Sequence, residues 1–158
     1  MTETPAFLAD RLKSEGDKTI AFFNSLKDEN WEITVYTEGS EWTIRNVLAH
    51  FVSAEQGFIR LFKDILAGGK GAADDFDIDR YNAKQQELIK DASRQELVKF
   101  FQAGRFEMVS LVGSLSIEDL QREGRHPFLG LTTLAEMIKM VYRHNQIHHR
   151  DLRKLIDD

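Results

Sequence analysis

A long amphipathic helix is predicted over residues 43–69, which read TIRNVLAHFVSAEQGFIRLFKDILAGG. Thr43 is a favourable capping residue at the start of this segment, and Gly68 with Gly69 is typical of a helix end. The apolar residues recur at steps of three and four, so they form one stripe along a helix. The stripe contains Val47, Leu48, Phe51, Phe58, Leu61, Phe62 and Ile65. Such a stripe indicates a helix that packs against other helices.

Helical patterns also occur on both sides of this segment. The first covers residues 5–26 and starts with Pro5, where the missing N–H is harmless. Another helical region follows residue 79, breaks near Asp91 and continues to Gly113, and a last one runs to about Ile156. Capping boxes, in which Ser or Thr precedes Glu by three residues, open two of these helices: Ser93 with Glu96, and Thr133 with Glu136. Both prolines, Pro5 and Pro127, lie outside the long periodic segments.

The connections between these helices differ in length and composition. Residues 68–79 are glycine-rich and acidic, which predicts a surface loop. Residues 114–132 predict a long loop with at most one turn of helix, at 116–120. We therefore expect an all-α fold, a four-helix bundle with long connections, formed by residues 1–158 as a single domain. Its topology stays open, because long connections permit crossovers as well as simple up-and-down neighbours.

Composition excludes several classes of protein. Apolar residues make up 42% of the chain and charged residues 30%, as in ordinary globular proteins. No apolar run approaches the length of a membrane span, and the N-terminus lacks the features of a leader, so we expect a cytoplasmic protein that does not bind membranes. The net charge of −5 and the absence of a basic stripe argue against nucleic acid as a partner. There is no cysteine, so any metal must be bound by nitrogen or oxygen.

Three histidines are candidates for a metal site. His144 and His148 are four residues apart on the last predicted helix, so they point the same way. His148 falls within the apolar stripe of that helix, His144 lies near its edge, and His50 lies at the border of the buried face of its own helix. Neighbouring buried imidazoles repel each other when protonated, and a cation resolves this. Three neutral imidazoles suit nickel, zinc, copper or iron and leave coordination positions open.

An alternative is that these are unconnected, partly buried histidines. The H-x-x-x-H pair alone is weak, because Asn145 stands where the protease signature H-E-x-x-H has glutamate. We expect His149 to lie at the helix surface or behind the metal ligands. His126 could cover the site, but we favour an exposed loop position for it. Two further residues, Glu55 and Tyr142, are near enough along their helices to reach the site, but structural or surface roles are commoner for both types.

With these residues placed, the chain resembles the DinB/YfiT-like superfamily of metal-dependent proteins. Residues 42–50, with Trp42 and His50 at their ends, are similar to the family's W-[ST]…L-x-H segment, and residues 144–152 are similar to its C-terminal H-x-x-x-H segment. Residues 115–120 and 126–130 also resemble recurring loops of the family. The resemblance implies a four-helix bundle, often dimeric, that binds nickel or zinc through His50, His144 and His148.

The family resemblance implies a reaction only loosely. It suggests a metal-dependent enzyme in which water or an exogenous low-molecular-weight thiol attacks an electrophilic small-molecule substrate, as in a hydrolase or a thiol-dependent transferase or isomerase. No catalytic residue is assigned by the sequence. One alternative is a non-catalytic stress protein that binds a metal or a small ligand, and another is an interaction bundle without metal, which predicts that the histidines do not converge.

Overall fold

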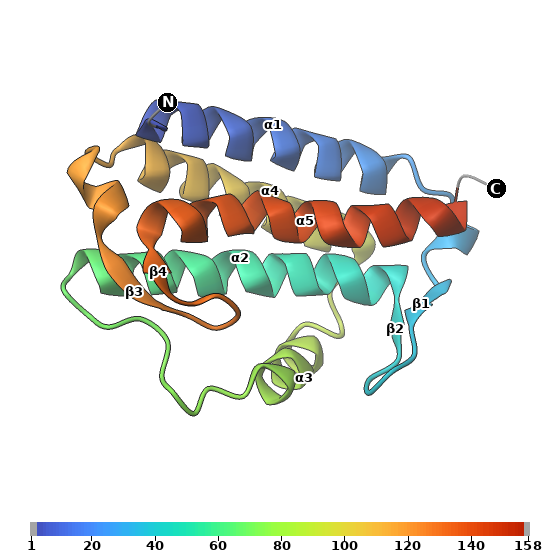
Figure 1. Cartoon of the computed structure of the whole chain (residues 1–158). Coiled ribbons are helices and arrows are strands. Elements are labelled where there is room, and N and C mark those ends of the chain that lie inside the picture. Colours follow the sequence, from blue (N-terminus) through green and yellow to red (C-terminus); the bar gives the residue numbers. More distant parts are fainter. Residues whose placement is uncertain (1–2, 157–158) are drawn as a thin grey trace.

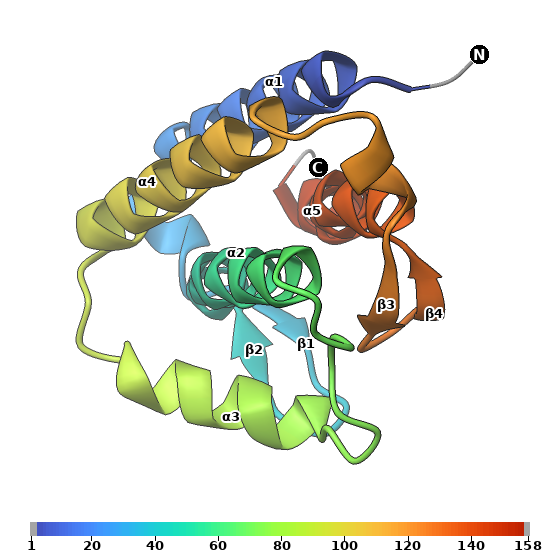
Figure 2. The ribbon, with the colours of Figure 1, turned by 90° about the vertical axis from the view of Figure 1, so that its left-hand side faces the viewer.

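Four long helices lie side by side, and a shorter fifth helix lies outside them (Figures 1 and 2). The computed structural model describes residues 3–156. In these residues the helices are α1 (Pro5–Asn24), α2 (Ile44–Leu66), α3 (Ile78–Leu88), α4 (Arg94–Gly113) and α5 (Leu134–Ile156). The short elements are the 3₁₀ turns η1 (Asp28–Asn30) and η2 (Glu118–Gln121) and the strands β1 (Thr34–Tyr36), β2 (Trp42–Thr43), β3 (Glu123–His126) and β4 (Gly130–Thr133). The predicted four-helix bundle is confirmed.

The bundle has neighbouring helices that run parallel as well as antiparallel. α1 packs on α4 and α5, and α2 packs on the same two helices from the other side. α1 and α5 run in one direction, whereas α2 and α4 run in the other (Figure 1). Because α2 and α4 are parallel neighbours, residues 67–93 must return along the outside of α2, and α3 lies in this return segment (Figure 2). This segment covers the side of α2 that faces away from α1.

The helices begin where the capping patterns of the sequence predicted. Backbone amides bond to the capping hydroxyls of Thr4, Thr43, Ser93 and Thr133, at 3.1, 3.3, 3.1 and 3.3 Å. The Ser93 box is complete, since the Glu96 carboxylate accepts from the Ser93 amide at 3.0 Å. The Glu136 carboxylate instead accepts from Lys139, at 2.8 Å. Each cap satisfies a backbone donor that the first helical turn leaves free.

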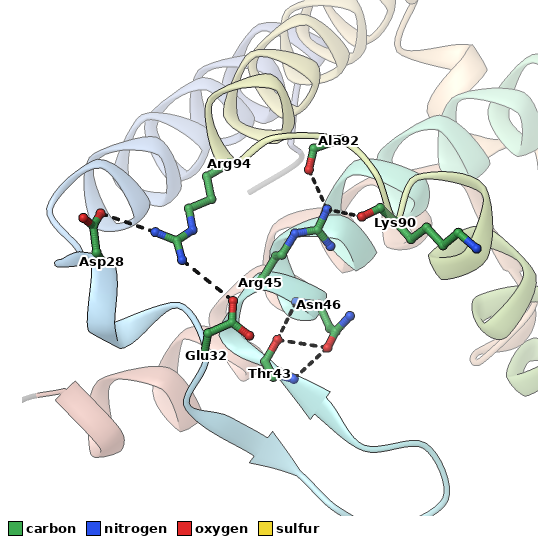
Figure 3. A network of polar contacts seen from close by, with 8 residues as sticks. All are labelled: Asp28, Glu32, Thr43, Arg45, Asn46, Lys90, Ala92 and Arg94. Carbon is green, nitrogen blue, oxygen red and sulfur yellow. Dashed lines mark hydrogen bonds and ion pairs between the residues drawn. The ribbon is translucent and has the colours of Figure 1, made fainter.

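The start of α2 is fixed by polar contacts from both sides (Figure 3). The Asn46 side chain accepts from the Thr43 amide at 2.9 Å, which completes the cap. The Arg45 guanidinium donates to the carbonyls of Lys90 and Ala92, at 2.9 and 2.6 Å, and so binds the segment between α3 and α4. These contacts in the first turn of α2 therefore fix the position of the helix, and with it the position of His50 two turns further on.

The first turn of α4 is linked to the segment that follows α1. Arg94 lies 3.3 Å from an oxygen of Asp28 and 3.7 Å from an oxygen of Glu32 (Figure 3). Both acidic side chains are largely exposed, so these ion pairs contribute little to stability. Their effect is to hold the segment that continues into β1.

A buried polar layer separates two apolar clusters. One cluster includes Leu8, Leu12, Phe58, Phe62, Met108, Val112, Leu134 and Ile138. The other includes Phe23, Ile44, Phe51, Leu97, Phe101 and Leu152. Between them along their helices lie Glu55 on α2, Arg105 on α4 and Asn145 on α5. Arg105 donates to the side chains of Glu55 and Asn145 and to the Leu12 carbonyl on α1, the last at 2.9 Å. One guanidinium from α4 therefore links α4 to the other three bundle helices.

The long connections contain β-hairpins, which the sequence did not predict. β1 pairs with β2, and β3 pairs with β4 from Glu123↔Thr133 to His126↔Gly130. Runs of two to four residues are too short to show the alternation by which a strand is recognised. The expected loop over 114–132 is therefore wrong over residues 123–126 and 130–132, which form strands. The glycine-rich loop also pairs with this hairpin, because the Ala72 amide donates to the Arg125 carbonyl at 2.8 Å.

None of the helices in residues 3–156 combines the length and the hydrophobicity that crossing a bilayer requires.

Candidate metal centre

The three predicted histidines converge on one point between α2 and α5. The Nε2 atoms of His50 and His144 are 2.9 Å apart, and those of His148 and His144 are 3.2 Å apart. One nitrogen of each ring lies within 4.8 Å of the others. His50 and His144 are 6% and 7% exposed, and His148 is half-buried. The structure therefore brings together all three residues that the sequence singled out.

The three rings lie nearly perpendicular to one another. Their planes cross at 79° to 89°, and their centroids lie 4.7 to 5.3 Å apart. Phe51, one residue after His50, packs against His144 and His148 at 6.0 and 5.6 Å between centroids. Trp42 covers His50 at 5.0 Å. This packing restricts the rings so that their Nε2 edges face each other.

The residues fit a divalent transition metal. Two nitrogens bound to one tetrahedral ion at about 2.0–2.1 Å lie about 3.3 Å apart, close to the two short separations observed. Three imidazoles are a donor set that zinc, nickel, copper and iron accept. His144 Nε2 faces the Nε2 atoms of both other rings, at 2.9 and 3.2 Å. This atom carries either one proton or one lone pair, so it cannot make a full hydrogen bond to each of them.

Burial keeps the triad neutral. It lowers the pKa of His50 to about 3, together with a smaller effect of the neighbouring His148. Burial also lowers the pKa of His144 well below its ordinary value, with added effects from the charges of His50 and His148. Burial lowers the pKa of His148, which the charge of Asp151 partly offsets. At neutral pH each ring thus has a nitrogen lone pair available for a cation.

Tyr36 and Asp151 orient His148. The Tyr36 hydroxyl lies 2.8 Å from His148 Nδ1 and 2.6 Å from Asp151 Oδ2. A carboxylate only accepts, so the single hydroxyl proton is donated to Asp151, and the hydroxyl accepts from the N–H of His148 Nδ1. Burial, and then the hydrogen bond to Asp151, raises the pKa of Tyr36, which keeps that proton in place. The Nε2 lone pair of His148 consequently points at the other two histidines.

Neither Tyr36 nor Asp151 was predicted from the sequence. Asp151 is three residues after His148 on α5, a spacing that places both on one face of the helix. This spacing could have indicated Asp151 as a neighbour of His148. Tyr36 lies on β1, 112 residues away in the sequence, and no periodic pattern connects it with α5.

Glu55 and Tyr142 do not contribute to the triad. Both oxygens of Glu55 accept from Arg105, at 2.6 and 3.0 Å. Tyr142 is 6% exposed in the apolar core, with the Arg11 guanidinium 4.9 Å from its ring centroid. The structural roles expected for these residues are confirmed.

His126 and His149 are more buried than expected. His126 is 1% exposed, because the β3–β4 hairpin folds it onto Phe58, with ring centroids 5.6 Å apart. Its prediction as an exposed loop residue is wrong. His149 is 5% exposed and stacks on Phe51 at 6.2 Å. Of the two positions expected for His149, the helix surface and a place behind the triad, the structure shows the second.

A cavity of about 300 Å³ opens beside the triad. His50 and His144 line one end of it. The remaining walls come from α2, the segment 71–76, α3 and the turn between β3 and β4. A small molecule in this cavity would lie next to the histidine nitrogens.

Several solved structures have the same fold. An uncharacterised protein from Escherichia coli UTI89 is 18% identical, with 96% of this chain and 91% of that chain covered and a TM-score of 0.76. YfiT from Bacillus subtilis, described as a probable metal-dependent hydrolase with an unusual four-helix bundle topology, is 19% identical, with 93% and 85% covered and a TM-score of 0.72. The colibactin self-resistance protein ClbS, solved in complex with dsDNA, is 13% identical, with 92% and 95% covered and a TM-score of 0.66.

At these identities the solved structures establish the fold alone. No curated protein matches the chain at a significant level. The sequence profile of the DinB superfamily, however, matches residues 11–152, which include all three histidines, the whole of α2, α3 and α4, and most of α1 and α5. Because this match spans most of the sequence, we conclude that the chain belongs to the DinB superfamily.

Proposed function

We propose that His50, His144 and His148 bind one divalent transition metal ion, nickel or zinc, and that the protein is a metal-dependent enzyme. The observation that carries the proposal is the convergence of three Nε2 atoms, at 2.9 and 3.2 Å, in a buried setting that keeps the rings neutral. The similarity in fold to YfiT, described as a probable metal-dependent hydrolase, supports it. The interaction bundle without metal predicted dispersed histidines, which the structure contradicts.

The reaction class follows from the donor set and its surroundings. When bound, a divalent ion supplies Lewis-acid activation of water or of a small thiol for attack on an electrophile. The chain has no cysteine, so a thiol would have to be supplied as a cosubstrate. Tyr36 holds the Nδ1 proton of His148, and the ring of Phe128 stacks on His144 at 6.3 Å, so these residues orient the ligands and restrict water on one side of them.

A second function is favoured by the lining of the cavity. Most of its residues are apolar, and the one carboxylate among them, Asp64, already accepts from the Gly71 amide at 3.0 Å. A mostly apolar cavity with few polar groups is also what a non-catalytic protein that binds a metal or a small ligand would need. The two functions differ in whether turnover accompanies binding.

Metal analysis tests the site. Protein treated with a chelator and then equilibrated with zinc or nickel should retain one ion per chain. His144→Gln should lower the affinity by at least about 100-fold, since removal of one of three ligands disrupts the set. His149→Gln is the matched control, because His149 is an equally buried histidine on the same helix outside the triad. Unchanged affinity in His144→Gln would reject the site.

Activity assays separate the enzyme from the binding protein. The metal-loaded protein should accelerate hydrolysis of an ester or addition of a small thiol to an electrophile, and His144→Gln should lose this activity together with the metal. Loss of metal with no activity in any form of the protein would favour the non-catalytic function.

A further inference from the structure

The cavity beside the triad extends along α2 from His50 to Asp64, and its chemistry differs between its two ends. One end is formed by His50 and His144, and Arg60 lines the wall further along α2. Ten residues of α-helix separate His50 from Arg60, a rise of about 15 Å. A ligand that reaches both ends must therefore be an extended molecule rather than a compact one.

Small side chains on α2 create this space. Ala54 and Gly57 line the cavity one and two turns after His50. A Cβ atom at Gly57 would lie 3.2 Å from the hydroxyl of Tyr81 on α3, so the glycine lets this tyrosine approach α2 closely. The small side chains of α2 therefore leave a channel open between α2 and α3.

Aromatic rings form the walls of the channel. Phe58 lies at the base, where it is 7% exposed, whereas Phe76 and Phe128 at the mouth are 41% and 48% exposed. Phe128 stacks on His144, and Phe76 packs on Tyr81 at 5.5 Å. Half-exposed aromatic faces on two sides of one channel suit a flat apolar body, which would remove them from water.

The far end of the channel has an available positive charge. Arg60 donates to the Tyr81 hydroxyl at 2.8 Å, and within residues 3–156 it makes no ion pair. Asp64 also lines the channel, but its carboxylate accepts from the Gly71 amide at 3.0 Å and forms no ion pair with Arg60 in residues 3–156. A guanidinium whose side chain is held by one hydrogen bond and whose other donors are free is a binding group for a carboxylate.

We propose that this channel binds a small molecule with an aromatic body and a carboxylate. The carboxylate lies at Arg60, the rings lie between Phe58, Phe76 and Phe128, and the opposite end of the molecule lies beside His50 and His144. The identification of this molecule as the substrate rests on the proposed function. The binding of its aromatic and anionic parts does not depend on the proposed function, because none of the groups that contact these parts is a metal ligand.

Two matched probes test the proposal by calorimetry on the full chain: biphenyl-4-carboxylate and the neutral biphenyl-4-carboxamide. The carboxylate should bind about tenfold more tightly than the carboxamide, as expected for one charge-assisted contact. Arg60→Gln should abolish this preference without weakening carboxamide binding. Arg150→Gln, a matched loss of charge at an exposed position of α5 outside the channel, should preserve it. Phe76→Ser should weaken both probes by about the same factor, at least threefold.

The zinc-loaded and the chelator-treated protein are both titrated, so that the channel and the metal site are judged separately. Probe binding without metal retention would overturn the proposed function and leave the channel intact. Metal retention without binding of either probe would overturn the channel proposal. Equal affinities for the two probes, or a preference that survives Arg60→Gln, would overturn the carboxylate assignment.

Discussion

Arg105 on α4 and Glu55 on α2 form a two-pronged ion pair in the centre of the bundle, where they are 3% and 2% exposed. A third contact, from Arg105 to the Asn145 side chain at 2.6 Å, brings α5 into the same network. A Cβ atom at Gly16 on α1 would lie 2.7 Å from Arg105 Cγ, so that glycine makes room for the guanidinium. Asn145 is the residue directly after His144, and the network therefore also fixes one side of the triad.

Loss of Arg105 alone should be strongly destabilising. Arg105→Met leaves the Glu55 carboxylate buried without a partner, and we expect a loss of about 3–5 kcal/mol in the free energy of unfolding. Urea denaturation monitored by circular dichroism measures it. The double variant Arg105→Met with Glu55→Gln should recover part of this loss, because no buried charge remains. A loss below about 1 kcal/mol in the single variant would show that the pair is not needed for stability.

Tyr36→Phe should weaken the metal site without unfolding the protein. The variant removes the acceptor for the Nδ1 proton of His148, and outer partners of this kind affect metal affinity by about 10- to 100-fold. Competition titration with a chromophoric chelator measures the affinity. Tyr81→Phe, a tyrosine outside the triad's contacts, is the control and should bind metal as the wild type does. Equal affinities in the wild type and Tyr36→Phe would mean that His148 is oriented by packing alone.

His126 should make the protein sensitive to acid. Its Nδ1 accepts from the amides of Phe128 and Leu129, at 3.0 and 3.3 Å, and burial lowers its pKa from 6.5 to about 4. Between these values the unfolded chain binds a proton that the folded protein does not, so stability is full above pH 6.5 and falls as the pH approaches 4. The other buried histidines act in the same direction.

His126→Asn isolates the contribution of this residue. The Asn oxygen can accept from the same amides and does not titrate, so the loss of stability between pH 7.5 and 5 should be smaller than in the wild type by about 1–2 kcal/mol. Urea denaturation at the two pH values gives both losses. If the variant loses as much stability as the wild type, His126 is not protonated selectively in the unfolded chain.

The homodimer expected from the family resemblance stays a prediction. Light scattering at micromolar concentration should give twice the mass of one chain. A monomer mass under these conditions would refute it.

The sequence predicted the bundle helices well because their ends are marked by local chemistry. Thr43 and Ser93 cap their helices as their spacing indicated, and the apolar stripe of α2 is the face that is buried. The triad was predictable for a similar reason, because the periodicity of each helix alone shows which of its residues face the interior. Tyr36 was not, because its contact with α5 depends on how a three-residue strand folds against a distant helix. His126 was misjudged because Gly and Pro neighbours indicate a turn but not what the turn covers.

The division of the triad between α2 and α5 has a consequence for biosynthesis. His50 and His144 are 94 positions apart in the sequence. At a translation rate of about 5–20 residues per second, several seconds pass between the synthesis of the first ligand and that of the second. During that time a ribosome-bound chain presents single histidines with no partner, so an ion would be captured only after the last helix has left the ribosome and docked. Loading with metal would then follow the docking of α5 and depend on which metal the folded bundle meets.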